Sequence, residues 1–132
     1  MTLHVELVSP EQVLYSGDAD MVICRTTDGE IAFLTDHAPF VGALAIGAVS
    51  IRVPDGETVR AAVHGGFVEV SHNQVTILSD VAEMAHEIDL LRAETAKETL
   101  EAKLREEHDA EVEAGLRRAH VRIELAGSRT GH

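Results

Sequence analysis

The chain changes its hydrophobic period once, near residue 87, and this change limits the folds that are open to it. Upstream, short apolar segments with strand-like alternation, such as LHVELV at residues 3–8, are separated by turn signals. From Ile88 onward, apolar residues recur every three or four positions, which is the spacing of an amphipathic helix. The sequence therefore predicts β structure in residues 1–86 and a separate helical region in residues 87–132.

Turn residues divide the first region into short segments. All three prolines and seven of the ten glycines lie there. VPDGET, residues 53–58, predicts a turn because proline fixes φ and Asp-Gly tolerates a reversed backbone. In residues 59–78, VRAAVHGGFVEVSHNQVTIL, the pairs GG and HN are expected to separate β-rich runs. About ten short strands without intervening helices are typical of an antiparallel β-sandwich or a flattened barrel.

The second region carries two apolar stripes. Their members are Leu90, Ala93, Ala96 or Lys97, Leu100 and Leu104, and then Val112, Leu116, Ala119, Ile123 and Ala126. REEHDAEVE, residues 105–113, lies between them and offers Asp109 as an N-cap, but it contains neither glycine nor proline. Two helices can therefore fold as a hairpin, or run as one long helix if a partner covers the stripes. We predict an α+β chain with a C-terminal two-helix hairpin.

Charge and composition exclude several classes of protein. Eleven Lys and Arg against 23 Asp and Glu give a net charge of −12, which opposes binding to nucleic acid or to anionic lipid. The single cysteine, Cys24, has no partner for an internal disulfide, as is usual in a reducing compartment. No segment approaches the roughly 18 apolar residues of a membrane span. We therefore expect a soluble intracellular protein without direct membrane insertion.

Signals of catalysis are missing from the sequence. It contains no phosphate-binding glycine loop of the G-x-x-x-x-G-K-[ST] type and no G-x-S-x-G nucleophile turn. The eight histidines are scattered without the close spacing that predicts a metal site: His4, His37, His64, His72, His86, His108, His120 and His132. The HGG segment before Phe67 is interpreted as a tight turn that starts a strand. We predict a non-catalytic chain with no metal and no resident cofactor.

Several motifs, in a fixed order, resemble one family. GEIAFLTDHAPFVGALAIGAVSI, residues 29–51, contains the G-E…H-A-P motif, and GGFVEV and VTILSD follow it. Together with the helical C-terminal region, this order is similar to the epsilon subunit of bacterial F-type ATP synthases over essentially the whole chain. The resemblance implies a ten-stranded β-sandwich followed by a helical hairpin, and it implies no catalytic activity.

The resemblance also implies partners and a location. Such subunits join the gamma subunit of the central stalk to the membrane-embedded c-ring, and their helices can extend into the alpha/beta catalytic head to hold back ATP hydrolysis. The expected location is peripheral, on the cytoplasmic face of the bacterial plasma membrane. By analogy, Glu30, His37, Ala38 and Pro39 face the c-ring. The alternative is that these residues only shape a turn and a loop.

A second set of residues matches the signature of family members that bind ATP. Ile88, Asp89, Arg92 and Ala93 provide the I/L-D-x-x-R-A pattern, with Glu83, Arg118 and Arg122 as matching partners. Carboxylates can accept from an adenine amino group or a ribose hydroxyl, and arginines can hold phosphate oxygens bidentately. A folded hairpin is expected to bring these residues together. The alternative is that Asp89 favours the helix dipole and forms an exposed pair with Arg92.

The same region carries the expected inhibitory contacts. In an extended chain, Arg117, Arg118 and Arg122 would meet acidic loops of the catalytic head, so the last two would serve either ATP or the head. Two other functions stay open on sequence grounds. One is a free-standing ATP-sensing module with the sandwich as its scaffold, and the other is a small β-barrel enzyme that uses scattered histidines and carboxylates.

Overall fold

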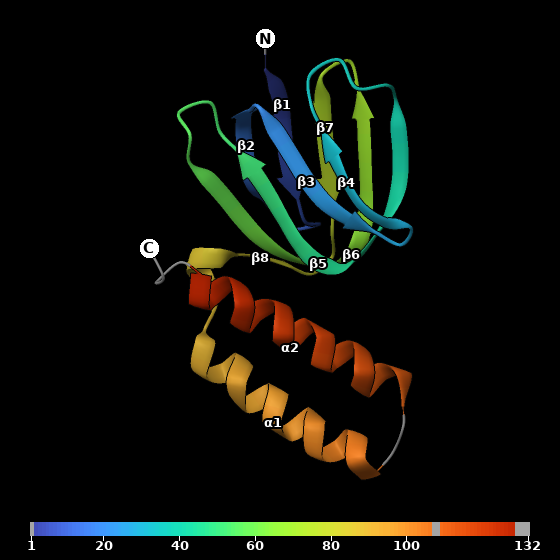
Figure 1. Ribbon diagram of the computed structural model, residues 1–132, viewed down its shortest axis with the longest axis vertical. Helices are drawn as coiled ribbons and strands as arrows, with labels where there is room; N and C mark the ends of the chain where they lie inside the picture. The colour runs from blue at the N-terminus through green and yellow to red at the C-terminus, as the bar shows by residue number, and fades with distance from the viewer. Residues whose placement is uncertain (1, 107–108, 129–132) are drawn as a thin grey trace.

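A computed structural model describes residues 2–106 and 109–128 of the chain. Figure 1 shows a β-sandwich with the N-terminus at one end and two helices packed beneath the other end. The second helix lies directly under the sandwich, and the first helix lies on its far side. The α+β prediction of a sandwich followed by a helical hairpin is confirmed.

Eight strands form the sandwich. They are β1 (Leu3–Val8), β2 (Val13–Ala19), β3 (Met21–Thr26), β4 (Gly29–Phe33), β5 (Phe40–Arg52), β6 (Thr58–Ser71), β7 (Gln74–Leu78) and β8 (Ala82–Met84). The sequence predicts about ten, and the structure has eight because β5 and β6 are long strands of 13 and 14 residues. Both bend at the lower end of the sandwich and continue into its second layer.

The strands pair in the order β2-β1-β7-β6-β5-β3-β4, and β8 adds to β6. All pairs are antiparallel except β1 with β7, which are parallel. The prediction of an antiparallel sandwich is therefore correct except at this pair. A tight turn forces the two strands that it joins to pair antiparallel, but β1 and β7 are not joined by one. Turn residues in the sequence therefore do not predict the direction in which these two strands pair. The two ends of the sheet fold over one core.

The core follows the period-two pattern of the strands. In β1, Leu3, Val5 and Leu7 are fully buried, whereas the residues between them are half-exposed. Phe33 and Ile51, from β4 and β5, meet them in the same cluster. Every member of this core cluster lies between residues 3 and 84. The sandwich thus contains its own hydrophobic core without help from the helices.

The two turn predictions in β6 have different outcomes. His72 and Asn73 have positive φ angles of 50° and 59° and form the two-residue turn between β6 and β7, as the HN signal predicts. The GG prediction is wrong, because Gly65 and Gly66 lie inside β6 and separate no strands. Before them β6 pairs with β8, and after them it pairs with β7. The glycines therefore mark the change of layer within one continuous strand.

Two helices follow a short 3-10 turn, η1 (Ala85–Glu87): α1 (Leu90–Glu106) and α2 (Ala110–Ser128). The predicted boundary between residues 86 and 87 falls inside η1. Asp109 Oδ1 accepts from the backbone N–H of Glu111 at 2.7 Å, as expected of an N-cap. Part of the predicted connection, residues 107 and 108, lies outside the described residues. The helices pack as a hairpin and not as one long helix.

The contact between α2 and the sandwich is made with β5 and β6. Ala62 on β6 faces away from the sandwich core and is buried against Leu125 and Ala126 of α2, together with Ile88. Alanine contributes little apolar area, and area determines most of the gain from burial. The hairpin is therefore attached through a cluster in which the sheet contributes small side chains, Ala48 and Ala62, and the helical region contributes larger aliphatic ones.

Candidate functional site

A pocket opens where β8, η1, α1 and α2 meet, and its volume is about 430 Å³. Its lining residues are Val81, Glu83, Glu87, Asp89, Arg92, Ala93, Ala96 and Arg122. Five of them belong to the predicted nucleotide-binding set. The folded hairpin thus brings together residues that are distant in the chain, such as Glu83 and Arg122, which are 39 positions apart.

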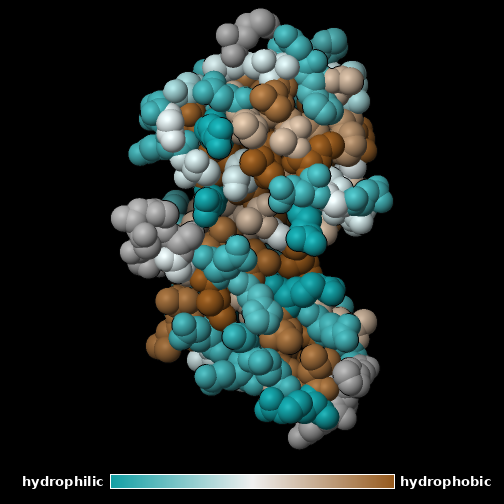
Figure 2. Space-filling model, in the orientation of Figure 1, coloured by the Kyte–Doolittle hydropathy of each residue, from teal (hydrophilic) through white to brown (hydrophobic). Residues whose placement is uncertain are grey.

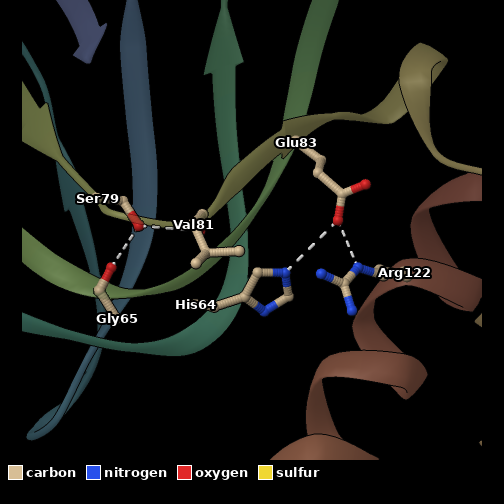
Figure 3. Close-up of polar contacts among 6 residues, drawn as sticks. All are labelled: His64, Gly65, Ser79, Val81, Glu83 and Arg122. Atoms are coloured by element: carbon tan, nitrogen blue, oxygen red, sulfur yellow. Dashed lines mark hydrogen bonds and ion pairs between the residues drawn. The ribbon is translucent and has the colours of Figure 1, made fainter. Parts of the chain in front are cut away.

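A charged pair joins the two sides of this pocket. Arg122 Nε on α2 donates to Glu83 Oε1 on β8, and Figure 3 shows the two side chains pointing toward each other across the gap. About a third or less of each side chain is exposed, at 27% for Arg122 and 33% for Glu83. Partial exclusion of water strengthens such a pair relative to a fully exposed one. The pair is the polar link between the sandwich and α2.

His64 lies directly beneath this link. Its side chain is only 2% exposed, and its Nε2 lies 3.9 Å from Glu83 Oε1 (Figure 3). Neither ring nitrogen has a hydrogen-bond partner among the described residues. Burial lowers the pKa of His64 to about 4, and the positive charge of Arg122 adds to this effect, while Glu83 acts in the opposite direction. His64 is therefore neutral at neutral pH.

Asp89 and Arg92 interact differently from the predicted side-chain pair. Asp89 Oδ1 accepts from the backbone N–H of Arg92 at 3.0 Å, so Asp89 caps the first turn of α1. Within residues 2–106 and 109–128, the Arg92 guanidinium forms no ion pair. The capping interpretation explains the position of Asp89, and it leaves the exposed Arg92 side chain available at the mouth of the pocket.

The other predicted residues of this set lie outside the pocket. Ile88 is 3% exposed and packs against Ala62 and Leu125, so it belongs to the apolar cluster between the sheet and α2. Arg118 is not among the lining residues, although its charge acts on His64. The pocket therefore gathers five of the seven residues, and the role of the set in nucleotide binding stays a prediction. Arg117 lines a different cavity on the other side of α2.

The residues expected at the c-ring are divided between the two ends of β4. Glu30 is at its start, paired across the sheet with Arg25, whereas His37 follows its end. His37 packs against the core ring of Phe33, with 4.9 Å between centroids, and its Nδ1 lies 2.7 Å from Ala38 O. Ala38 and Pro39 are exposed. Since β4 is the last strand of the sheet, its free edge connects both ends.

Sequence reasoning missed two features that the structure brings out. His64 was one of eight scattered histidines, and only the three-dimensional pairing of β6 with β8 places it beneath Glu83. The second feature is an exposed apolar surface on β5, β6 and β7, formed by Val41, Phe67 and Leu78 at 73%, 60% and 50% exposure. The alternation of apolar and polar residues along a strand assigns side chains to two faces, but it does not show which face is exposed to solvent.

Histidines and acids do not assemble a metal site within residues 2–106 and 109–128. His108 and His132 lie outside these residues. Neither α1 nor α2, over the residues that the structure describes, is long and apolar enough to span a bilayer.

Together, fold and pocket define a class of protein in which a β-sandwich is followed by a docked helical hairpin. The family described as ATP synthase, Delta/Epsilon chain, beta-sandwich domain, matches residues 2–85. The chain is 46% identical to the ATP synthase epsilon chain of Streptomyces avermitilis over 127 residues, which cover 96% of this chain and 97% of the relative. This chain therefore belongs to the ATP synthase epsilon chain family, as the motifs predict, and is a non-catalytic subunit.

Other relatives agree with this assignment. The ATP synthase epsilon chain of Halalkalibacterium halodurans is 45% identical, covering 96% of this chain and 98% of the relative. Among solved structures, a chain of the Euglena gracilis mitochondrial ATP synthase has a TM-score of 0.75 at 22% identity, covering 99% of this chain and 82% of that one. At this identity the likeness establishes the fold alone.

Proposed function

We propose that the chain is a central-stalk subunit whose sandwich contacts a gamma-type subunit and the c-ring, and whose helices restrain ATP hydrolysis by the alpha/beta head. The complex would hold it at the cytoplasmic face of a bacterial plasma membrane. The observation that carries the regulatory part is the attachment of α2 to the sandwich through the Glu83–Arg122 pair and an apolar cluster whose sheet side consists of Ala48 and Ala62. An element held in this way can leave the sandwich when another surface binds it better.

The exposed apolar surface of Val41, Phe67 and Leu78 supports a permanent protein contact for the sandwich. Phe67 and Leu78 are direct neighbours across β6 and β7, so their side chains form one continuous area. Together with Val8 and Pro10 they border a hollow of about 460 Å³. Large apolar side chains clustered at a surface typically mark a protein interface. We assign this surface to the gamma-type partner.

The proposed c-ring contact uses the edge of β4. Glu30, His37, Ala38 and Pro39 cannot meet in one compact spot, but a contact that runs along this edge strand reaches all of them. The loop before β5 is well positioned for this role because Asp36 is tied to Asn73: the Asp36 backbone N–H donates to Asn73 Oδ1 at 2.6 Å. A fixed loop loses little entropy when a partner binds.

Figure 2 shows hydrophobic surface interrupted by hydrophilic side chains over the helical half, as expected for a hairpin that can exchange partners. On undocking, Arg122 would lose Glu83 and become available to acidic loops of the head, together with Arg117 and Arg118. The docked form would instead offer Glu83, Asp89 and Arg92 to ATP in the pocket beneath α2. ATP would then oppose inhibition, because it binds the docked form alone.

The test is ATP hydrolysis by a catalytic head complex that lacks this subunit. The complex is titrated with the full chain and, separately, with residues 1–87, and binding of each is measured in parallel. We expect both to bind through the sandwich and only the full chain to suppress hydrolysis. Equal hydrolysis with the two would contradict the inhibitory role of the helices. If neither the full chain nor residues 1–87 binds the head complex, the central-stalk assignment is contradicted and a free-standing ATP-sensing module is favoured.

A further inference from the structure

A second and larger cavity lies on the opposite side of α2 from the pocket at Glu83. Its volume is about 770 Å³, and the β3–β4 hairpin, the middle of β5 and α2 enclose it. The polar residues of its lining are Arg25, Thr26, Thr27, Arg117 and His120. The two pockets share no lining residue. The interpretation of the Glu83 pocket therefore does not account for this cavity.

Positive charge is concentrated in this cavity within a strongly acidic protein. Arg25 comes from the sandwich, and Arg117 and His120 come from α2, about ninety positions later in the chain. Over residues 2–106 and 109–128, neither arginine forms an ion pair, in contrast to Arg122. Glu30 lies opposite Arg25 in the β3–β4 ladder but forms no ion pair with it among the described residues, so both arginines are available for an external anion.

The sandwich side of the cavity holds its residues in place. Gly47 on β5 leaves room for the stem of Arg25, since a Cβ added to Gly47 would lie 3.1 Å from Arg25 Cβ and 3.2 Å from its Cδ. Thr26 Oγ1 donates to Gly29 O at 2.7 Å and accepts from the Asp28 backbone N–H, which fixes the turn beside Arg25. A guanidinium with a packed stem loses less rotamer freedom on binding than a free one.

The rest of the lining is apolar. Leu44, Ala45, Ile46 and Val121 form it together with Gly29 and Gly65, so the cavity combines a cationic rim with a hydrophobic wall. This is the usual composition of small-molecule pockets, whose volumes run from about 300 to 1,000 Å³. An isolated inorganic anion would use only the rim.

We propose that this cavity binds a small phosphate-bearing anion between Arg25 of the sandwich and Arg117 of α2. Guanidinium groups hold phosphate oxygens bidentately, and the imidazole of His120 provides one more N–H donor. Because the ligands come from both sides of the interface, the bound anion stabilises the docked hairpin and opposes release of α2. This proposal is independent of ATP binding at the Glu83 pocket, since it depends on different residues.

The experiment is a titration of the isotopically labelled full chain, followed by amide NMR at constant ionic strength. Inorganic pyrophosphate and ribose 5-phosphate serve as probes, because the first uses only the cationic rim and the second also reaches the apolar wall. We expect saturable shifts at Thr26, Thr27 and His120 in the millimolar range or below. Arg25→Gln and Arg117→Gln should each weaken binding about tenfold or more.

Three further variants make the result decisive. Arg105→Gln on the exposed face of α1 is the matched control and should leave binding unchanged. Arg92→Gln reports on the other pocket and should also leave it unchanged. If Arg25→Gln fails to fold, Arg25→Lys and Arg117→Gln decide the question, since lysine keeps the charge but loses the bidentate geometry.

Absence of saturable shifts with both probes would overturn the proposal. Shifts that centre on Glu83 and Asp89, or binding that Arg92→Gln abolishes and Arg117→Gln does not, would also overturn it by assigning the anion to the other pocket. Loss of binding in Arg117→Gln with retention in Arg105→Gln supports it. A stronger response to ribose 5-phosphate than to pyrophosphate would identify the natural ligand as an organic phosphate.

Discussion

His64 is a buried base at the point where α2 meets the sheet. Its pKa differs between the docked and undocked states, so the docking equilibrium should depend on pH. In the docked state its pKa is about 4, since it is buried and faces Arg122 and Arg118 from α2, with only Glu83 of β8 opposing them. Undocking exposes the ring, and its pKa returns toward 6.5. The docked state therefore binds the proton less tightly, so docking weakens as pH falls from 6.5 toward 4 and is strongest above this window.

The measurement is amide hydrogen-exchange protection of α2 at several pH values, and the control is His64→Gln. The hairpin and η1 contain other histidines, including His86 and His120, so the full chain alone does not isolate one group. Replacement of His64 should flatten the pH dependence of α2 protection below pH 6.5. If the variant retains the whole slope, the dependence belongs to other histidines.

Gly66 is a position where only glycine fits. Its φ is +118°, and an added Cβ would lie 2.0 Å from Leu78 O on β7. Gly66→Ala should lower the free energy of unfolding by at least about 2 kcal/mol, because backbone strain and a backbone clash add together. Gly29→Ala is the matched control, since its φ is +122° with no neighbour within 4 Å of the added Cβ. Equal losses in chemical denaturation of the two variants would show that the clash is relieved at little cost.

Arg92 allows a residue-level test of the proposed ATP pocket. It lines the pocket, is exposed and forms no ion pair within residues 2–106 and 109–128. Arg92→Ala should weaken ATP binding about tenfold or more in calorimetry, by loss of a bidentate phosphate contact. The sandwich should stay folded, and Arg105→Ala should bind ATP like the unchanged chain. Unaltered affinity would remove Arg92 from the site.

The residue patterns predicted some of these roles and not others. Asp109 was recognisable as a cap because capping is local, and the acid and arginine of the I-D-x-x-R-A segment were recognisable because a motif is contiguous. His64 and the Arg25–Arg117 cavity depend on strands and helices that meet only in the fold. A single histidine or arginine has no sequence pattern that marks its spatial neighbours, so these features needed the structure.

At the scale of elements, the Glu83–Arg122 pair decides how α2 is held. Glu83→Gln removes the negative charge and keeps a similar shape, whereas Arg122→Gln removes the positive charge and shortens the side chain. We expect the pair to contribute a coupling energy of about 1 kcal/mol to docking, because both side chains are partly shielded from water. The measurement is a double-mutant cycle on the undocking free energy, from hydrogen exchange of α2.

The same cycle has an internal comparison. His4 and Asp18 form a more exposed contact at 3.7 Å within the sandwich, so its removal should leave α2 protection unchanged. Additive effects of Glu83→Gln and Arg122→Gln would mean that the pair does not link the two elements. In that case the apolar cluster around Ala62 would hold the hairpin without a contribution from the pair.

Element types were predictable because period two and period 3.6 differ over whole segments. The length of β6 was not, since GG is a common sign of a chain break and here marks a bend within a strand. The parallel pairing of β1 and β7 also has no local signal, because it joins segments about seventy positions apart. The exposed apolar surface on β5, β6 and β7 was equally hidden, since alternation identifies two faces without identifying which one is covered.

For the whole molecule, the two hydrophobic clusters predict a hierarchy of stability. All members of the sandwich cluster come from residues 3–84. The cluster between α2 and the sheet, by contrast, includes Ala62 and Ala48 of the sandwich. The fragment 1–87 should therefore keep its β-sheet circular dichroism and melt cooperatively close to the sandwich transition of the full chain. The fragment 88–132 should show little helix in isolation, because short helices without a packed face are marginal in water.

The proposed switch on the central stalk would require this hierarchy, since the sandwich must stay folded while the helices change partner. Mixing the two fragments should restore some helix, because the sandwich then supplies the face that the peptide lacks. Stable helix in the isolated peptide would contradict the prediction and would mean that an extended form needs no partner to support it. Loss of structure in fragment 1–87 would instead show that the hairpin stabilises the sandwich, and undocking would then compromise the coupling contact itself.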